Sequence, residues 1–251
     1  MTQHLTDRAA RAWITTMALF AETQPSGFHR DGPAGTAELV TGAPMPLLNG
    51  IISTAAEPDA DEIAEFAGSP RLTSVAWSLQ VRGGRVDDRI AATAAAHDLG
   101  QRTLLPFMLK DLESAVEPEA IAVREVSSVD SALYRTTMAA GYEGPAELFS
   151  VFAAPSVLDH LAMHGYVAEI DGTGVATSFG VLVDDMVGVF NIAVPPPFRR
   201  RGYGRAATAA VLRDAYALGA RTAFLHASPL GVPLYEAMGF VHAENWSLFT
   251  R

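Results

Sequence analysis

Glycines and clustered arginines stand together in one stretch of the chain, in a pattern that could bind an anion. Residues 194–205 read VPPPFRRRGYGR, between an apolar run expected to be a strand and an Ala-rich run expected to be a helix. The first amide groups of a helix lack partners within it, and the helix dipole favours negative charge there. Gly202 and Gly204 let the backbone approach phosphate oxygens closely, and the neighbouring arginines add positive charge. The pattern therefore predicts a diphosphate site before this helix.

The elements that would position this site follow an orderly pattern from Ile121 onward. A strand (IAVREV) and a helix (SSVDSALYRTTMAAGY) come first, and a second helix is expected around AELFSVFAAPSVL. Three apolar, β-branched runs separated by Asp-containing turns predict antiparallel strands: GYVAEIDG, GVATSFGVLVDD and MVGVFNIAV. After the arginine-rich loop we expect a helix over 202–218, a strand (RTAFLHAS), a short helix (VPLYEAM) and a last strand (VHAENWSLFT).

The N-terminal part also mixes strands and helices, and the polar segment DLESAVEPEA is the natural linker. We therefore expect an N-terminal domain over 1–112, a linker over 113–120 and a second domain over 121–251. A shift of the chain by about 119 positions lays Arg82 and Gly83 over Arg201 and Gly202, and DLGQRT over ALGART. This match indicates two copies of one loop, helix and strand unit, although any Arg-Gly loop before an Ala-rich helix would match similarly.

A second motif makes the pattern specific. Residues 194–204 match V-x-P-x-[YF]-R and [QR]-x-x-G-x-[GA], and residues 234–240 match L-Y-x-x-x-G-F after an intervening helix, strand and loop. In these residues the region 121–251 resembles the GNAT superfamily of acetyl-CoA-dependent N-acetyltransferases. The resemblance implies a mixed α/β (α+β) GNAT fold in a tandem arrangement, in which a central, mostly antiparallel sheet is flanked by helices in each half. The N-terminal half would be a partial, degenerate copy.

The resemblance also implies the activity and the residues of the site. The chain would be an acyltransferase that moves an acetyl group from acetyl-CoA to a primary amine, by direct attack on the thioester. Tyr235 matches the general acid that protonates the departing thiolate, although a packing tyrosine is the alternative. The residues expected to bind the cofactor are Ile192, Ala193, Val194, Arg199, Arg200, Arg201, Gly202, Tyr203, Gly204, Arg205 and Ser228.

The chain departs from the family pattern at two positions. Ser228 stands where the family often has Asn, and the strand MVGVFN offers no carboxylate where many members place a general base. The candidates for the base are Asp184, Asp185, His226 or a bound water, and each of these side chains could equally form a turn or pack. A non-catalytic acyl-CoA-binding or regulatory module is the alternative function.

The N-terminal half does not repeat the anion-binding pattern. It keeps Gly83 but has Arg85 where the second glycine would fall, followed by Asp87 and Asp88. Carboxylates at a helix N-terminus would repel a diphosphate. We expect this half to pack against the C-terminal sheet and to shape the acceptor pocket.

Composition excludes several other classes of function. The chain has no cysteine, no metal-ligand spacing among its seven histidines, and a net charge of -10, which argues against nucleic-acid binding and leaves a metal unexpected. No apolar run is long enough to span a membrane, and the N-terminus does not match a signal peptide, so a cytoplasmic protein is expected. The acceptor, a small-molecule or peptide amine, cannot be named from the sequence, and a homodimer is left open.

Overall fold

The computed structural model describes residues 2–114 and 119–251, and these pack as two compact units. Of the described residues, unit 1 comprises 2–108, 226–235 and 241–251, and unit 2 comprises 109–114, 119–225 and 236–240. These units are defined by packing, whereas the boundaries at 112 and 121 come from the sequence and remain a prediction.

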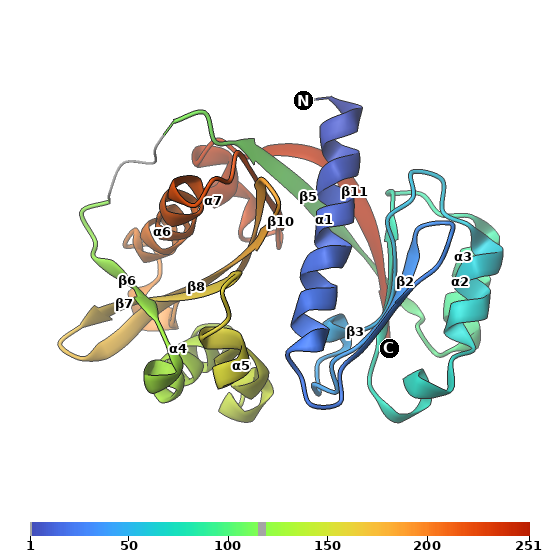
Figure 1. Ribbon diagram of the computed structural model, residues 1–251, viewed down its shortest axis with the longest axis horizontal. Helices are drawn as coiled ribbons and strands as arrows, with labels where there is room; N and C mark the ends of the chain where they lie inside the picture. Colours follow the sequence, from blue (N-terminus) through green and yellow to red (C-terminus); the bar gives the residue numbers. More distant parts are fainter. Residues whose placement is uncertain (1, 115–118) are drawn as a thin grey trace. The chain divides into compact units, whose positions relative to one another are not determined.

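Unit 1 is a twisted sheet with helices on both faces (Figure 1). Its strands follow the order β1-β2-β3-β4-β11, with β3 and β4 parallel and the other neighbours antiparallel. Helix α1 contacts β1 and β2, while α2 packs on β2, β3 and α3. The elements are α1 (Gln3–Glu22), β1 (Phe28–Asp31), β2 (Thr36–Val40), β3 (Asn49–Ser53), α2 (Ala60–Ala67), β4 (Ser78–Arg82), α3 (Asp88–Ala96) and β11 (Val241–Thr250).

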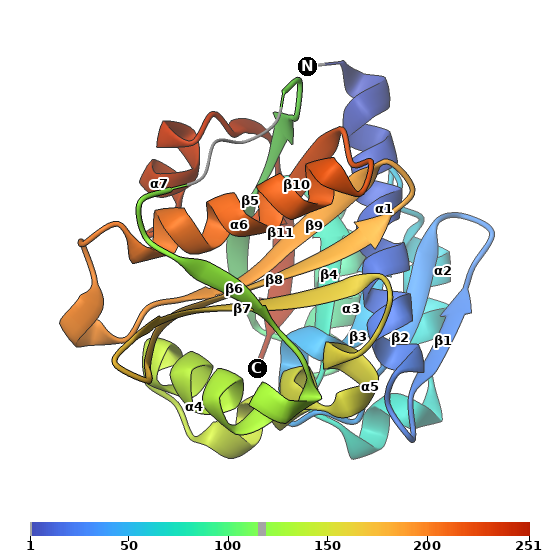
Figure 2. The ribbon, with the colours of Figure 1, turned by 60° about the vertical axis from the view of Figure 1, so that its left-hand side comes forward.

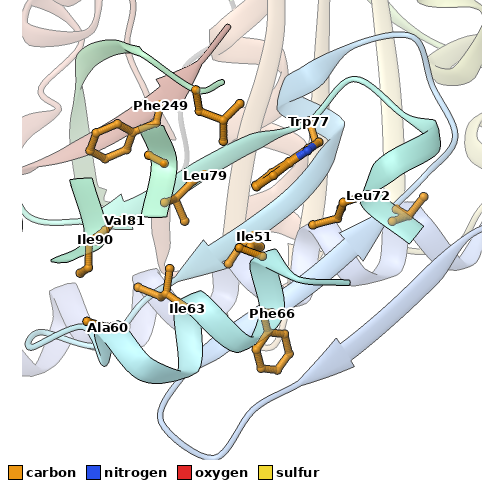
Figure 3. Close-up of a cluster of buried hydrophobic side chains, with 14 residues drawn as sticks. Ile51, Ala60, Ile63, Phe66, Leu72, Trp77, Leu79, Val81, Ile90 and Phe249 are labelled. Atoms are coloured by element: carbon orange, nitrogen blue, oxygen red, sulfur yellow. The ribbon is translucent and has the colours of Figure 1, made fainter. Parts of the chain in front are cut away.

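The core of unit 1 forms where α2 and α3 cover the sheet. Ile63 and Phe66 of α2, Ile51 of β3 and Leu79 of β4 belong to one cluster of buried hydrophobic side chains (Figure 3). Burial of side chains of this size supplies the main driving force for folding. Strand β5 (Gln101–Asp111) contains the border between the two units, which lies between Met108 and Leu109.

Unit 2 is a second, mostly antiparallel sheet, with strand order β10-β9-β8-β7-β6. Helix α6 covers one face and α4 the other (Figure 2). Among these five described strands, β9 and β10 are parallel and the other neighbours are antiparallel. The elements are β6 (Val123–Val126), α4 (Ser131–Tyr142), α5 (Pro155–Leu158), β7 (Met163–Ile170), β8 (Thr173–Val183), β9 (Met186–Ala193), α6 (Tyr203–Ala217) and β10 (Thr222–His226). Helix α7 (Val232–Ala237) crosses the border, with residues 232–235 in unit 1 and residues 236–237 in unit 2.

The predicted fold class is confirmed, since each unit has a mostly antiparallel sheet flanked by helices. The predicted antiparallel strands are also present as β7, β8 and β9, joined at tight turns in which Asp171 and Asp184 have positive φ. The expected second helix differs. It is a 3-10 segment, Ala146–Ala153, followed by the short helix α5, which starts at Pro155. Proline donates no amide hydrogen bond and clashes with the preceding turn, so a continuous helix cannot pass through it.

The two units share a run of helices and strands in the same order. However, the shift of about 119 positions does not align the equivalent helices of the two units. In unit 2, α6 connects the parallel pair β9 and β10. In unit 1, the parallel pair is β3 and β4, and the helix between them is α2. The sequence match instead lays α3, which follows β4, over α6. The repeat inferred from that shift is therefore wrong in its pairing, although both units have a helix, a three-stranded meander, a crossover helix and a parallel strand in the same order.

Candidate functional site

The pairing between strands β9 and β10 ends after a short ladder, so one edge of β9 is open. Their pairing runs only from Met186 with Thr222 to Gly188 with Phe224. Among the residues that the structure describes, nothing in β10 pairs with Val189–Ala193. In unit 1 the equivalent pair stays closed, since β3 pairs with β4 up to Ser53, its last residue. Unpaired backbone groups along a strand edge need another partner, so β9 offers hydrogen bonds to a ligand.

A bulge distorts β9 at the same place. The register with β8 shifts between the pairs Thr177 with Ala193 and Phe179 with Phe190. Asn191 takes a positive φ of 51°, and its carbonyl accepts a hydrogen bond of 3.0 Å from the Thr177 hydroxyl. A bulge bends its strand and re-aims the following residues. It therefore sets the direction of the backbone at Ile192, Ala193 and Val194, where β9 ends.

The loop after β9 forms a cradle of free amide groups. The amides of Phe198 and Arg199 donate to Pro195 and Pro196, and the first helical bond of α6 is made by Ala206 to Gly202. Between these turns, in the described part of the chain, no amide from residues 200–205 donates to a backbone carbonyl. Arg200 and Gly202 both have positive φ, of 62° and 88°. Successive amides in such a turn can form a concave anion site, which keeps the diphosphate site a prediction for this loop.

The four arginines around the cradle have different surroundings. The Arg199 guanidinium bonds to Val194, Gly141 and Glu143, and the Arg205 Nε atom pairs with Glu119 at 2.8 Å. Arg200 and Arg201 are exposed, and within residues 2–114 and 119–251 their side chains make no hydrogen bond or ion pair. These two charges are therefore available to an anion in the cradle. The partners of Arg199 and Arg205 belong to no sequence motif, so these contacts are not predictable from the sequence.

The corresponding helix of unit 1 has its amide groups already occupied. The Asp59 carboxylate caps α2 by accepting hydrogen bonds of 2.9 and 3.0 Å from the amides of Asp61 and Glu62. Asp61 and Glu62 place further negative charge in the first turn. A diphosphate would meet filled donors and three carboxylates there, so this position is unsuited to an anion.

Ser228 and Tyr235 lie close together in unit 1, on either side of Gly231. The exposed Ser228 accepts a hydrogen bond of 3.2 Å from the Gly231 amide at its hydroxyl oxygen. A Cβ atom built on Gly231 would come within 2.9 Å of the Tyr235 ring and 3.4 Å of the Ser228 hydroxyl. Tyr235 is 9% exposed, on helix α7. The glycine thus leaves room for the tyrosine ring beside the serine.

Two of the candidates for a general base lie at the wrong end of β9. Asp184 and Asp185 form the turn before the strand, whereas the cradle follows it. A β-strand rises about 3.3 Å per residue, so the turn and Ala193 are separated by roughly 25 Å. These aspartates are turn formers, in line with the positive φ of Asp184.

The third candidate, His226, is enclosed by aromatic rings of unit 1. Its ring centroid lies 4.3 Å from that of Trp13, 4.9 Å from Phe107 and 4.9 Å from Trp246. Burial lowers the pKa of His226 to about 3, opposed only by the Pro106 carbonyl. The imidazole is therefore neutral at pH 7 and has a low affinity for protons, which makes it a poor general base.

The burial of His226 predicts a loss of stability in mild acid. An unfolded chain protonates this histidine as pH falls through 6.5, whereas the folded protein resists until about pH 3. Stability should thus fall with pH between these values, by up to about 1.4 kcal/mol per unit and about 2 kcal/mol by pH 5. We expect His226→Leu to gain that amount relative to wild type between pH 7 and pH 5, in urea unfolding followed by tryptophan fluorescence. Leu79→Ala, a packing change elsewhere in unit 1, is the control. Parallel curves for His226→Leu and wild type would contradict the prediction.

Comparison with known proteins identifies the region that carries the cradle. Residues 132–240 match the Acetyltransferase (GNAT) family. This segment is therefore a GNAT acetyltransferase domain, and the predicted enzyme class is confirmed. A search of curated proteins finds no match.

Several solved structures share the fold over nearly the whole chain. A GCN5-related N-acetyltransferase from Kribbella flavida is 17% identical with a TM-score of 0.69, covering 98% of this chain and 95% of its own. A functionally unknown conserved protein from Staphylococcus epidermidis is 16% identical with a TM-score of 0.67, covering 92% and 96%. An acetyltransferase of the GNAT family from Novosphingobium aromaticivorans is 14% identical with a TM-score of 0.59, covering 94% of each chain. The folds of both units are thus found in other proteins.

Within the described ranges, no helix is long and apolar enough to cross a membrane. The same part of the chain holds no group of His, Asp and Glu side chains that could bind a metal ion.

Proposed function

We propose that this protein transfers an acetyl group from acetyl-CoA to a primary amine. The observation that carries the proposal is the cradle of free amides at 200–205 beside the open edge of β9. The diphosphate of acetyl-CoA would accept hydrogen bonds from the cradle and meet the charges of Arg200 and Arg201. The pantetheine and the thioester carbonyl would pair with the backbone of Ile192, Ala193 and Val194.

In the proposed reaction the neutral amine attacks the thioester carbonyl directly. Backbone donors of β9 stabilise the oxyanion as it develops, the C–S bond breaks, and Tyr235 protonates the departing thiolate. The proton lost by the amine passes to water, because neither His226 nor the turn aspartates suit that role. Ser228 is proposed to hydrogen-bond the donor near Tyr235. Unit 1 would select the acceptor, a small-molecule or peptide amine.

The test is a coenzyme A release assay with acetyl-CoA and a panel of small-molecule, peptide and protein amines. The released thiol is detected with a thiol reagent, to which the protein contributes no background because it has no cysteine. Amine-dependent release supports transfer. Binding of acetyl-CoA without release for any amine would instead support the alternative function, a non-catalytic acyl-CoA-binding module.

Hydrogen exchange provides a prediction about where acetyl-CoA binds. We expect the cofactor to slow amide exchange across residues 189–205, because it would occupy the open edge of β9 and the cradle. Residues 59–64 should not change, since Asp59 already caps α2. Exchange is measured by mass spectrometry of peptides with and without acetyl-CoA. Protection at α2 in place of the cradle would show that the cofactor binds unit 1.

A further inference from the structure

Arg199 spans the junction between helix α4 and the end of strand β9. Its Nε atom donates to the Val194 carbonyl at 3.0 Å, and its Nη2 atom donates to the Gly141 carbonyl at 2.9 Å and to the Glu143 carboxylate at 2.6 Å. Gly141 lies in the last turn of α4, where carbonyl groups lack partners within the helix. The guanidinium therefore satisfies acceptors on two elements that are distant in sequence.

The backbone at this junction is built for close approach. A Cβ atom on Gly141 would lie 2.7 Å from the Ala193 Cβ and 2.8 Å from the Val194 nitrogen, so only glycine fits there. Glu143 then ends the helix with a positive φ of 56°. This turn brings its carboxylate to Arg199. Together the contacts fix where the chain leaves β9 and enters the cradle.

The neighbouring arginines lack such contacts. Arg199 has its charge paired and both of the nitrogens named above engaged, whereas the side chains of Arg200 and Arg201 make no such bond to any described residue. The amide of Arg199 is also used, because it donates to the Pro196 carbonyl. For Arg199 to reach a phosphate, bonds to two carbonyls and a carboxylate would have to break.

We propose that Arg199 is a positioning residue, which clamps the end of α4 to the cofactor loop, and that Arg200 and Arg201 meet the charge of the ligand. The clamp holds the amides of residues 200–205 in the shape that binds a diphosphate. This assignment rests on the proposed function only in naming acetyl-CoA as the source of that diphosphate. The position of the loop between β9 and α6 would then depend on the position of α4.

A lysine at position 199 separates the two roles, because lysine keeps the charge but loses the planar fork that reaches several acceptors at once. If the Arg199 side chain binds phosphate through its charge, the Arg199→Lys variant should keep its affinity for coenzyme A. If Arg199 instead holds α4 against the loop, the variant should lose affinity. Arg200→Met and Arg201→Met are the matched variants, since they remove charge from the cradle without touching the junction with α4.

The experiment measures hydrogen exchange of the ligand-free proteins and the Kd for coenzyme A at 50 and 300 mM NaCl. We expect Arg199→Lys to speed exchange in residues 139–143 and 194–201, and to weaken coenzyme A binding about tenfold by a similar factor at both salt concentrations. Arg200→Met and Arg201→Met should leave ligand-free exchange unchanged. Their loss of affinity should shrink at high salt, because screening already weakens exposed charges there.

Wild-type exchange and affinity in Arg199→Lys would overturn the proposal. The proposal would also be overturned if Arg199→Lys left hydrogen exchange unchanged and its loss of coenzyme A affinity shrank at high salt. That pattern would show that the Arg199 side chain binds phosphate. If Arg199→Lys does not fold, Glu143→Gln removes one partner of the clamp and should speed exchange in the same segments to a smaller extent. The ligand-free measurement remains decisive even if wild type does not bind coenzyme A, a result that would refute only the proposed function.

Discussion

Replacing Gly204 with glutamate is expected to abolish the thermal stabilisation of the protein by acetyl-CoA. Gly204 lies in the first turn of α6, within the stretch of amides that have no backbone partner. A glutamate there adds a side chain where the diphosphate must approach and a negative charge that repels it. The fold itself should tolerate the change, because an acidic residue in the first turn interacts favourably with the helix dipole.

The size of the effect follows from linkage. At a concentration 100 times its Kd, a ligand adds about 2.7 kcal/mol to stability, which raises the Tm of a chain of this size by about 5–10 °C. We expect this rise in wild type and none in Gly204→Glu, measured by differential scanning fluorimetry. The matched control is Gly100→Glu, which makes the same charge change at an exposed position with no atom within 4 Å of the added Cβ. Retention of the shift in Gly204→Glu would place the cofactor elsewhere.

The cradle could be predicted from the sequence because its geometry is local. Gly202 and Gly204 follow an apolar strand and open an Ala-rich helix, and the first amides of a helix have no partner within the helix. Strands β7, β8 and β9 were predictable for a similar reason, since apolar, β-branched runs and the Asp-containing turns between them are recognised within a few residues.

Features that depend on contacts between distant residues could not be predicted. The open edge of β9 exists because pairing with β10 stops at Gly188, and no residue type marks that point. The Arg199 clamp needs Gly141 and Glu143, which lie more than fifty residues earlier in the chain. The sequence placed Arg199 in the site but gave no sign that its side chain faces α4.

The sequence match between the two halves paired the wrong helices, because α3 and α6 have similar composition but different positions in the topology. Arg-Gly loops before Ala-rich helices occur at both α3 and α6, yet only α2 and α6 connect parallel strands. That the N-terminal copy is unsuited to a diphosphate stays a prediction, which now depends on other residues. Asp59, Asp61 and Glu62 at the start of α2 carry the argument that was first made for Asp87 and Asp88.

Tyr235→Phe is expected to lower the rate of acetyl transfer about 100-fold while leaving the affinity for acetyl-CoA nearly unchanged. The ring, which is almost fully buried beside Gly231, still packs in the variant, and only the hydroxyl is lost. General acid catalysis is worth about 10²- to 10⁴-fold, and the lower end applies because a thiolate is a fairly good leaving group. The control is Tyr216→Phe, which removes a hydroxyl in the last turn of α6, far along the helix from the cradle.

The pH dependence of this variant separates a proton donor from a packing residue. At low pH, solvent can protonate the thiolate more readily, so the gap between wild type and Tyr235→Phe should narrow as pH falls. The rates are measured in single turnovers, where chemistry and not product release is observed. An equal rate for wild type and Tyr235→Phe across the pH range would make Tyr235 a packing residue. Protonation of the thiolate would then pass to water, since His226 stays neutral and buried among its aromatic neighbours.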